Sequence, residues 1–264
     1  MVEKDILGTI VDRKHVEVSG RQKQVSVPDL MEQINLQRPH RPFVEAIKTR
    51  SRQKLPAVIA EVKKASPSKG VIRQDFDPVA IAQSYERSGA TCLSVLTDVD
   101  FFQGSDQYLE MVKASSSLPV LRKDFIVDGY QVYESKAIGA DCILLIAAIL
   151  DIEKLHQFYD LAMSLNLDVL VEVHNKLGLD KALTLSPAMI GVNNRNLKTF
   201  EVSLETTLGL LTHIPSDTIV ITESGIGKRT DVDRMLSHEV YGFLVGEAFM
   251  REAEPGLALE SLFT

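Results

Sequence analysis

Short apolar runs recur along the chain, and each is followed by a stretch in which apolar residues return every three or four positions. The runs are rich in β-branched residues and end abruptly in polar, charged or glycine residues, which is typical of strands. They predict strands at 57–61, 91–96, 119–122, 141–147, 168–173, 189–193, 218–222 and 241–245. Because these runs are apolar almost throughout, they indicate strands that are covered on both faces, as in a parallel sheet.

The stretches between the runs predict amphipathic helices, among them 78–88, 129–138, 152–165 and 228–237. Two of these helices end near Gly89 and Gly139, and glycine supplies the backbone conformation that closes a helix. Eight βα units in about 200 residues match a (β/α)8 barrel in number and size, whereas a doubly wound sheet more often has fewer strands and a glycine-rich first turn. The sequence therefore predicts an α/β protein with a TIM barrel.

The first fifty residues lie outside this repeat. Helical patterns at 5–13, 29–36 and 41–50 predict an N-terminal helical extension, which we expect to plug the amino-terminal face of the barrel or to pack on its outer ring. No glycine- or serine-rich linker interrupts the chain. We therefore expect a single domain over residues 1–264, with the extension at 1–50 and the barrel at 55–264.

Composition and charge exclude several classes of protein. The 264 residues are 45% hydrophobic and 25% charged, which excludes collagen-like, low-complexity and disordered chains. A net charge of −7 argues against a nucleic-acid partner, for which a basic face would be expected. The N-terminus has no apolar stretch of the kind that a signal peptide or membrane span needs, and Cys92 and Cys142 lie inside apolar runs as expected of buried thiols. We expect a cytoplasmic protein without a membrane partner.

The carboxyl ends of the predicted strands, where barrel enzymes place their functional residues, are polar in this chain. The residues there are Glu61, Lys63, Ser66, Arg122, Lys123, Asp124, Glu172, His174, Asn193, Arg195, Glu223, Ser224 and Gly225. Residues two apart on a strand point the same way, so Glu61 and Lys63 can face one cavity. A structural salt bridge between strand ends explains any single one of these residues as well as a functional role does. It explains the whole ring less well.

Glycine-bearing turns at 223–227 and 246–247 follow the last two strands, where barrels often bind a phosphate through backbone N–H groups. Simple turns are the alternative. The six histidines show no paired spacing, and the sequence has no cysteine cluster, P-loop or Ser-His-Asp elbow, so we expect no metal site. The acids, lysines and glycine turns indicate proton transfer on a sugar phosphate without a cofactor.

Several ordered segments resemble indole-3-glycerol phosphate synthase. They are AEVKKASPSKG (60–70), FFQGS (101–105), PVLRKDFIVDGYQ (119–131), LVEVHN (170–175), GVNNRNL (191–197), ITESGI (221–226) and FLVGEAFM (243–250). The match covers nearly the whole chain, and SPSKG together with RKDFIVD is more specific than a generic phosphate motif. The resemblance implies a carboxy-lyase of tryptophan biosynthesis, which closes the indole ring of 1-(2-carboxyphenylamino)-1-deoxyribulose 5-phosphate and releases CO2 and water.

The resemblance also implies roles for individual residues. Lys123 would protonate the ribulose carbonyl oxygen as the ring closes. Lys63 and Asn193 would orient the carboxylate before it leaves. Glu172, with Lys63, would transfer protons in the dehydration, and the sequence leaves open how the two divide that step. Glu61 would keep the lysines protonated and oriented.

Other residues match positions that bind the substrate in this family. They are Ser66, Arg195, Glu223 and Ser224 for polar contacts, Pro67, Phe102, Phe125, Leu144 and Leu197 for the wall around the anthranilate ring, and Gly225, Gly246 and Glu247 for the phosphate. Glu247 stands where other members carry a hydroxyl residue, so we expect its backbone N–H and not its carboxylate to serve the phosphate. Ala65 replaces a basic residue of some members, which leaves more of the charge compensation to Lys63.

The sequence leaves two other functions open. A phosphoribosylanthranilate isomerase-like barrel would call for an acid–base pair that usually includes a cysteine, yet neither Cys92 nor Cys142 ends a predicted strand. A non-catalytic barrel that binds a phosphometabolite would show a broken set of catalytic residues, and here the set is complete. We expect the protein to act on a small molecule as a monomer.

Overall fold

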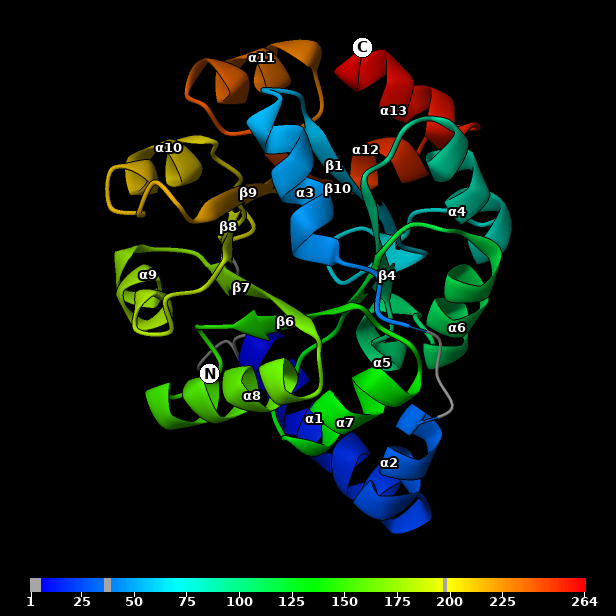
Figure 1. The fold of residues 1–264 in the computed structure, drawn as a ribbon. Helices are drawn as coiled ribbons and strands as arrows, with labels where there is room; N and C mark the ends of the chain where they lie inside the picture. Colours follow the sequence, from blue (N-terminus) through cyan, green and yellow to red (C-terminus); the bar gives the residue numbers. More distant parts are fainter. Residues whose placement is uncertain (1–5, 36–38, 197–198) are drawn as a thin grey trace.

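The computed structural model describes residues 6–35, 39–196 and 199–264. Eight parallel strands close into a barrel in the order β1-β10-β9-β8-β7-β6-β5-β4 (Figure 1). The strands are β1 Ala57–Val62, β4 Cys92–Leu96, β5 Val120–Lys123, β6 Cys142–Ile146, β7 Asp168–Val173, β8 Met189–Asn193, β9 Ile219–Glu223 and β10 Gly242–Val245. Each lies within one residue of its predicted bounds, so the TIM barrel predicted from the sequence is confirmed.

Helices surround the barrel and connect its strands. They are α4 Pro78–Arg87, α5 Val99–Phe102, α6 Asp106–Ser115, α7 Tyr130–Ala137, α8 Ile152–Ser164, α9 Lys176–Leu183, α10 Glu205–Leu211, α11 Arg229–Ser237, α12 Glu247–Met250 and α13 Pro255–Phe263. A short hairpin, β2 Ala65–Ser66 with β3 Gly70–Val71, lies between β1 and α4. Among the described residues, no helix is long and apolar enough to cross a membrane.

The strands are buried on both faces, which explains their continuous apolar sequence. Residues that point outward, such as Val58 and Val95, belong to the large core between the strands and the surrounding helices. Residues that point inward, such as Ile59 and Leu121, fill the lower part of the barrel together with both cysteines. This filled base leaves free space at the opposite, carboxyl end of the strands.

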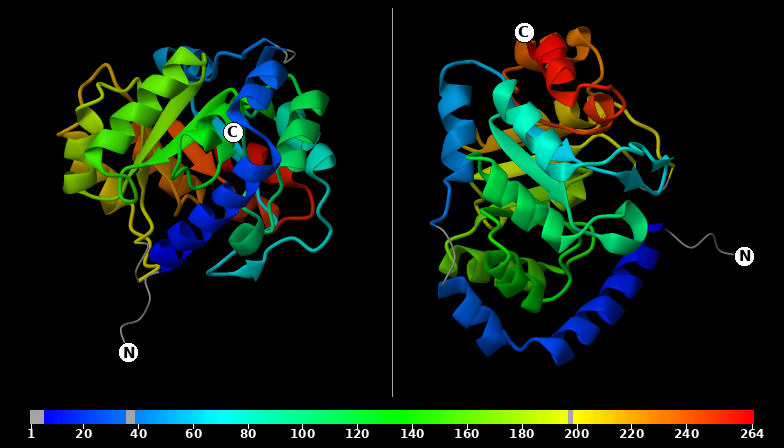
Figure 2. Two further views of the ribbon diagram at one scale, coloured as in Figure 1. Left: turned by 90° about the horizontal axis from the view of Figure 1, so that it is seen from below. Right: turned by 90° about the vertical axis from the view of Figure 1, so that its right-hand side faces the viewer.

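The extension forms α1 Ile6–Gln24, α2 Val27–Asn35 and α3 Phe43–Arg52. Helix α3 plugs the amino-terminal face as expected, because its Phe43 and Ile47 are fully buried against the barrel base. Figure 2 shows α1 and α2 running along one side of the barrel, from the end where the N-terminus lies to the end that α3 covers. The start of α1 corrects our expectation, because Ile6 and Ile10 line the cavity at the carboxyl ends of the strands.

Buried charge explains where α1 lies. The side chain of Lys14 is 2% exposed, and its Nζ is 2.9 Å from Asp124 Oδ1 and 3.0 Å from Asp98 Oδ2, both beyond strand ends. Glu17 of the same helix adds a third carboxylate at 2.9 Å. Burial alone would lower the pKa of Lys14, but these carboxylates outweigh it and raise the pKa above its ordinary value. These ion pairs of Lys14 therefore hold the helix to the carboxyl end of the barrel.

Candidate active site

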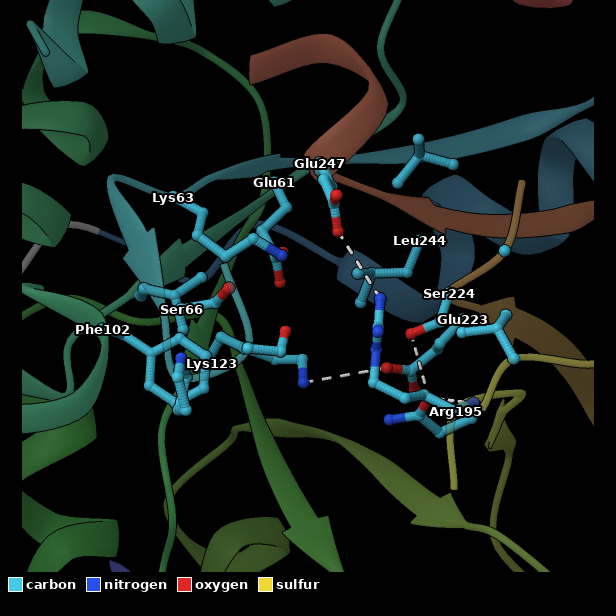
Figure 3. A pocket seen from close by; sticks show the side chains of 18 of the residues that line it. Glu61, Lys63, Ser66, Phe102, Lys123, Arg195, Glu223, Ser224, Leu244 and Glu247 are labelled. Atoms are coloured by element: carbon cyan, nitrogen blue, oxygen red, sulfur yellow. Dashed lines mark hydrogen bonds and ion pairs between the residues drawn. The ribbon is translucent and has the colours of Figure 1, made fainter. Parts of the chain in front are cut away.

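A cavity of about 760 Å³ opens at the carboxyl ends of the strands, a size that suits a small-molecule ligand (Figure 3). It is lined by Glu61, Lys63, Ser66, Pro67, Phe102, Lys123, Phe125, Leu144, Glu172, Asn193, Arg195, Glu223, Ser224, Gly225, Gly246 and Glu247. These are the site residues predicted from the sequence except for Leu197, which lies outside the described residues. Within the described part of the chain, no group of three or more His, Cys, Asp or Glu side chains could hold a metal ion.

Lys123 ends β5 and points into the cavity between two glutamates. Its Nζ lies 3.2 Å from Glu172 Oε2 and 3.7 Å from Glu223 Oε2. Burial would lower the pKa of this ammonium group, but the neighbouring carboxyl groups, Glu172 foremost, outweigh burial and raise it above its ordinary value. Lys123 is therefore protonated at neutral pH and can give a proton to a substrate.

Glu172 lies near the end of β7 inside the barrel and is only 2% exposed. Its Oε1 accepts a hydrogen bond from Asn193 Nδ2 at 3.3 Å and lies 3.2 Å from His174 Nε2. Burial would raise the pKa of this carboxyl, but Lys123 and His174 outweigh burial and lower it. Glu172 stays ionised and can accept a proton.

Asn193 is held in one orientation by three polar contacts. Its Oδ1 accepts from the backbone N–H of Arg195 and from the hydroxyl of Ser224, both at 3.0 Å. The amide nitrogen is thereby turned toward Glu172. Asn193 therefore presents an N–H donor to the cavity, which is what a role in holding a substrate carboxylate requires.

The turn after β9 is built from two residues in the left-handed backbone region, Ser224 with φ 65° and Gly225 with φ 84°. Such a conformation is unfavourable for serine and needs support from its surroundings. Asn194 supplies it, since this buried amide donates to the carbonyl of Ser224 at 3.0 Å and to the hydroxyl of Thr222 at 2.8 Å. Asn194 was not predicted from the sequence; its position directly after Asn193, where alternation turns its side chain the other way, was the available signal.

Glu61 and Lys63 also line the cavity, with the lysine Nζ 2.5 Å from Glu61 Oε2. We expected both side chains to face one cavity, and the ion pair shows that they point the same way. The neighbouring Gly246 has a second role besides the predicted phosphate contact. A Cβ atom on Gly246 would lie 2.5 Å from Glu61 Oε2, so glycine at this position makes room for the carboxylate.

Glu247 lies at the rim of the cavity and is paired with two arginines. Its Oε1 accepts from Arg251 at 2.8 Å, and its Oε2 lies 3.5 Å from Arg195 Nη2 (Figure 3). Burial would raise its pKa, but Arg251 and other cations lower it, so the group is an anion. This carboxylate therefore neutralises part of the positive charge that Arg195 and Arg251 bring to the rim of the cavity.

One side of the cavity is apolar. The rings of Phe102 and Phe125 have their centroids 5.9 Å apart, and Pro67 and Leu144 line the same cavity. An aromatic ring can stack in such surroundings. The apolar residues contributed by α1 were missed, because a helical pattern does not show which end of the barrel the helix reaches.

Arg122 belongs to the polar ring that the sequence predicts, but its side chain points away from the cavity. It is 1% exposed, and its Nη2 lies 2.8 Å from Glu134 Oε2 and 2.9 Å from Asp106 Oδ1, in the helix layer. Arg21 of α1 contacts the same two carboxylates. The cause is the alternation along β5, which sends Arg122 outward where it sends Lys123 inward.

Comparisons with known proteins agree with this fold. Three solved TIM barrels are similar to the chain: tryptophan synthase subunit alpha from Legionella pneumophila str. Paris (TM-score 0.63, 12% identity, covering 85% of this chain and 97% of that one), KGPDC from Streptococcus mutans (0.61, 11%, 79% and 95%) and thiamine phosphate pyrophosphorylase from Pyrococcus furiosus (0.57, 16%, 80% and 95%). At such identities the likeness shows the fold alone. The family model described as indole-3-glycerol phosphate synthase matches residues 7–262, and the chain therefore belongs to the indole-3-glycerol phosphate synthase family.

Proposed function

We propose that this chain is a carboxy-lyase that converts 1-(2-carboxyphenylamino)-1-deoxyribulose 5-phosphate into indole-3-glycerol phosphate, CO2 and water. The observation that carries the proposal is the position of the Lys123 ammonium group, which lies beside Glu172 and Glu223 in a cavity with an aromatic side. Ring closure requires a proton donor beside an aromatic ring, and this arrangement supplies one. We further propose that the enzyme works as a cytoplasmic monomer on this small molecule, without a cofactor.

The substrate is oriented by its two ends. Its anthranilate ring lies against Phe102 and Phe125, and its phosphate lies at the turns that contain Gly225 and Gly246. This places the ribulose carbonyl between the two ends, near Lys123. The lysine gives a proton to the carbonyl oxygen while the aromatic carbon attacks the carbonyl carbon, so that a new C–C bond and a hydroxyl group form.

Decarboxylation and dehydration follow in the same cavity. Lys63 and the N–H of Asn193 hold the carboxylate until it leaves as CO2, and its bonding electrons restore the aromatic ring. The new hydroxyl then leaves as water after it takes up a proton, while the carbon next to the ring nitrogen loses one. Glu172 and Lys63 share these two proton transfers, one as a carboxylate and the other as an ammonium group.

The cavity favours this reaction over that of a phosphoribosylanthranilate isomerase. Cys92 and Cys142 lie in the filled base of the barrel, far from the catalytic end, and burial raises the pKa of both thiols. Neither can supply the cysteine that such an isomerase usually uses. The residues that carry charge in the cavity are lysines and glutamates instead.

A fluorescence assay tests the proposal. The purified protein is incubated with the carboxyphenylamino substrate, and we expect the emission of the indole product to rise with time. Glu172→Gln serves as the matched variant, which should bind the substrate but turn it over slowly. Turnover of N-(5-phosphoribosyl)anthranilate instead would favour the isomerase, and binding of either compound without turnover would favour a non-catalytic barrel.

A further inference from the structure

A third carboxyl group lies beside Lys123, and the steps described above do not use it. Glu223 ends β9, is 2% exposed and lines the cavity. Its Oε2 faces the lysine, whereas its buried Oε1 has no hydrogen-bond donor among the described residues. A buried carboxylate oxygen without a donor is costly, but the same oxygen in a protonated carboxyl group can itself donate.

The strand next to β9 is shaped around this carboxyl group. A Cβ atom on Gly191 of β8 would lie 2.1 Å from Glu223 Oε1 and 3.2 Å from its carboxyl carbon. Glycine inside a strand weakens it, because it adds flexibility and packs nothing. Gly191 is nevertheless placed in β8, and its missing side chain leaves room for Glu223. The backbone of the barrel therefore accommodates this carboxyl group.

Charge at the base of the cavity does not balance if every acid is ionised. Lys63 is matched by Glu61 at 2.5 Å, but Lys123 faces both Glu172 and Glu223. The other ionisable neighbour, His174, contacts Glu172, with its Nε2 3.2 Å from Glu172 Oε1. One ammonium group cannot compensate two buried carboxylates, and two carboxyl groups at one site share a proton.

The geometry indicates which of the two acids holds this proton. Glu172 is nearer to Lys123 and also accepts from Asn193, whereas Glu223 lies farther from the lysine. Burial raises the pKa of Glu223 well above its ordinary value, and the neighbouring charges of Glu172 and Glu61 add to this effect against the opposing charge of Lys123. A hydrogen bond between the two carboxyl groups acts in the same direction.

We propose that Glu223 is a neutral carboxylic acid in the resting enzyme, hydrogen-bonded to ionised Glu172, and that it returns a proton to Lys123 after ring closure. This proposal rests on the proposed function. Lys123 becomes a neutral amine when it protonates the ribulose oxygen; the Glu223 O–H then gives its proton to the lysine Nζ and becomes a carboxylate. Loss of CO2 from a carboxylate consumes one proton per turnover, and solvent returns that proton to Glu223. Lys123 is therefore charged again before dehydration.

Stability at different pH values tests the neutral acid without any substrate. A carboxyl group whose pKa is higher in the folded state destabilises the fold increasingly as pH rises above its unfolded value. Glu223→Gln keeps the shape of the neutral acid, so its midpoint of denaturant unfolding should exceed that of the parent protein by a margin that widens from about pH 5 to about pH 8. Glu172→Gln is the matched control and should lower the midpoint, since it removes the ionised partner of Lys123. A midpoint lowered equally at all pH values in Glu223→Gln would overturn the proposal.

Infrared spectroscopy tests whether Glu223 is protonated, and kinetics test whether it returns a proton to Lys123. The parent protein at neutral pH should show the carbonyl stretch of a protonated carboxyl group, and Glu223→Gln should lose this band. The same variant should lose about tenfold or more in kcat with little change in KM, because it cannot recharge Lys123. Absence of the band would overturn the neutral acid. An unchanged kcat, in a parent enzyme that makes the indole product, would overturn the proton return and leave the synthase function standing.

Discussion

At the scale of single residues, the protonation state of Lys123 depends on side chains from three other strands. Glu61 comes from β1, Glu172 from β7 and Glu223 from β9, while Lys123 itself ends β5. The residue types and their strand ends were predictable from the sequence. Their protonation states were not, because they depend on distances between groups that are far apart in the chain.

The first prediction concerns Lys123→Met, which keeps an unbranched side chain but removes the proton donor. We expect kcat to fall by about 10²- to 10⁴-fold, the usual contribution of general acid catalysis. Lys176→Met is the control, because this lysine is exposed on α9 and pairs with Asp180 on the surface. Circular dichroism checks that both variants fold. Near-normal turnover of the Lys123 variant would rule out its role as the acid.

The second prediction concerns Glu247→Ser. The substitution releases Arg195 and Arg251 from a carboxylate that competes with a phosphate, and it retains the backbone N–H at this position. We expect KM to stay the same or to decrease, with kcat unchanged, in steady-state assays at low ionic strength. A large increase in KM would mean that the carboxylate itself is needed to hold Arg195 in place.

At the scale of elements, the sequence predicted the strands well and the place of α1 poorly. The strands are buried on both faces, so each one appears in the sequence as an apolar run with sharp ends. The position of α1 depends on buried ion pairs to Asp98 and Asp124, and a lysine in a helix pattern looks like an exposed residue. The short hairpin β2–β3 was missed as well, because two-residue strands carry no periodicity.

The third prediction tests the anchor of α1 through Lys14→Met. This substitution removes the buried cation that Asp98 and Asp124 share, while Asp124 retains Arg122 Nη2 at 3.5 Å. Breaking a buried ion pair typically costs about 3–5 kcal/mol. We expect faster amide hydrogen exchange in α1 and a lower kcat/KM, because Ile6 and Ile10 would no longer close the cavity. Arg13→Met is the control on the same helix; its ion pair with Asp100 is solvent-exposed, so exchange in α1 should change little. Equal exchange in both variants would contradict the anchor.

At the scale of the whole molecule, the buried ion pairs set the response to acid. Burial would raise the pKa of Asp124, but Lys14 and Arg122 outweigh burial and lower it. A carboxyl group with a lowered pKa stabilises the fold above its unfolded value, near pH 4, and this contribution is lost as pH falls toward the folded value.

The fourth prediction follows from this loss of stability at low pH. The free energy of unfolding, measured with denaturant at a series of pH values, should fall steeply below about pH 4. In Lys14→Met the fall should be shallower. Without Lys14 the pKa of Asp124 is lowered less in the folded state, so protonation of Asp124 costs less stability. Parallel curves for the two proteins would show that Asp124 does not depend on Lys14.

The anchoring of α1 also constrains how the chain folds while it is being synthesised. Arg13 binds Asp100, which is 87 positions later, and Arg21 binds Glu134, which is 113 positions later. Helix α1 is therefore synthesised long before these partners, and its apolar Val18 cannot pack against Tyr130 and Ala137 until α7 has been made. The barrel can close only later, because β1 pairs with β10, the last of the eight barrel strands along the sequence. Translation must therefore reach β10 before the barrel, and the cavity at its carboxyl end, can close.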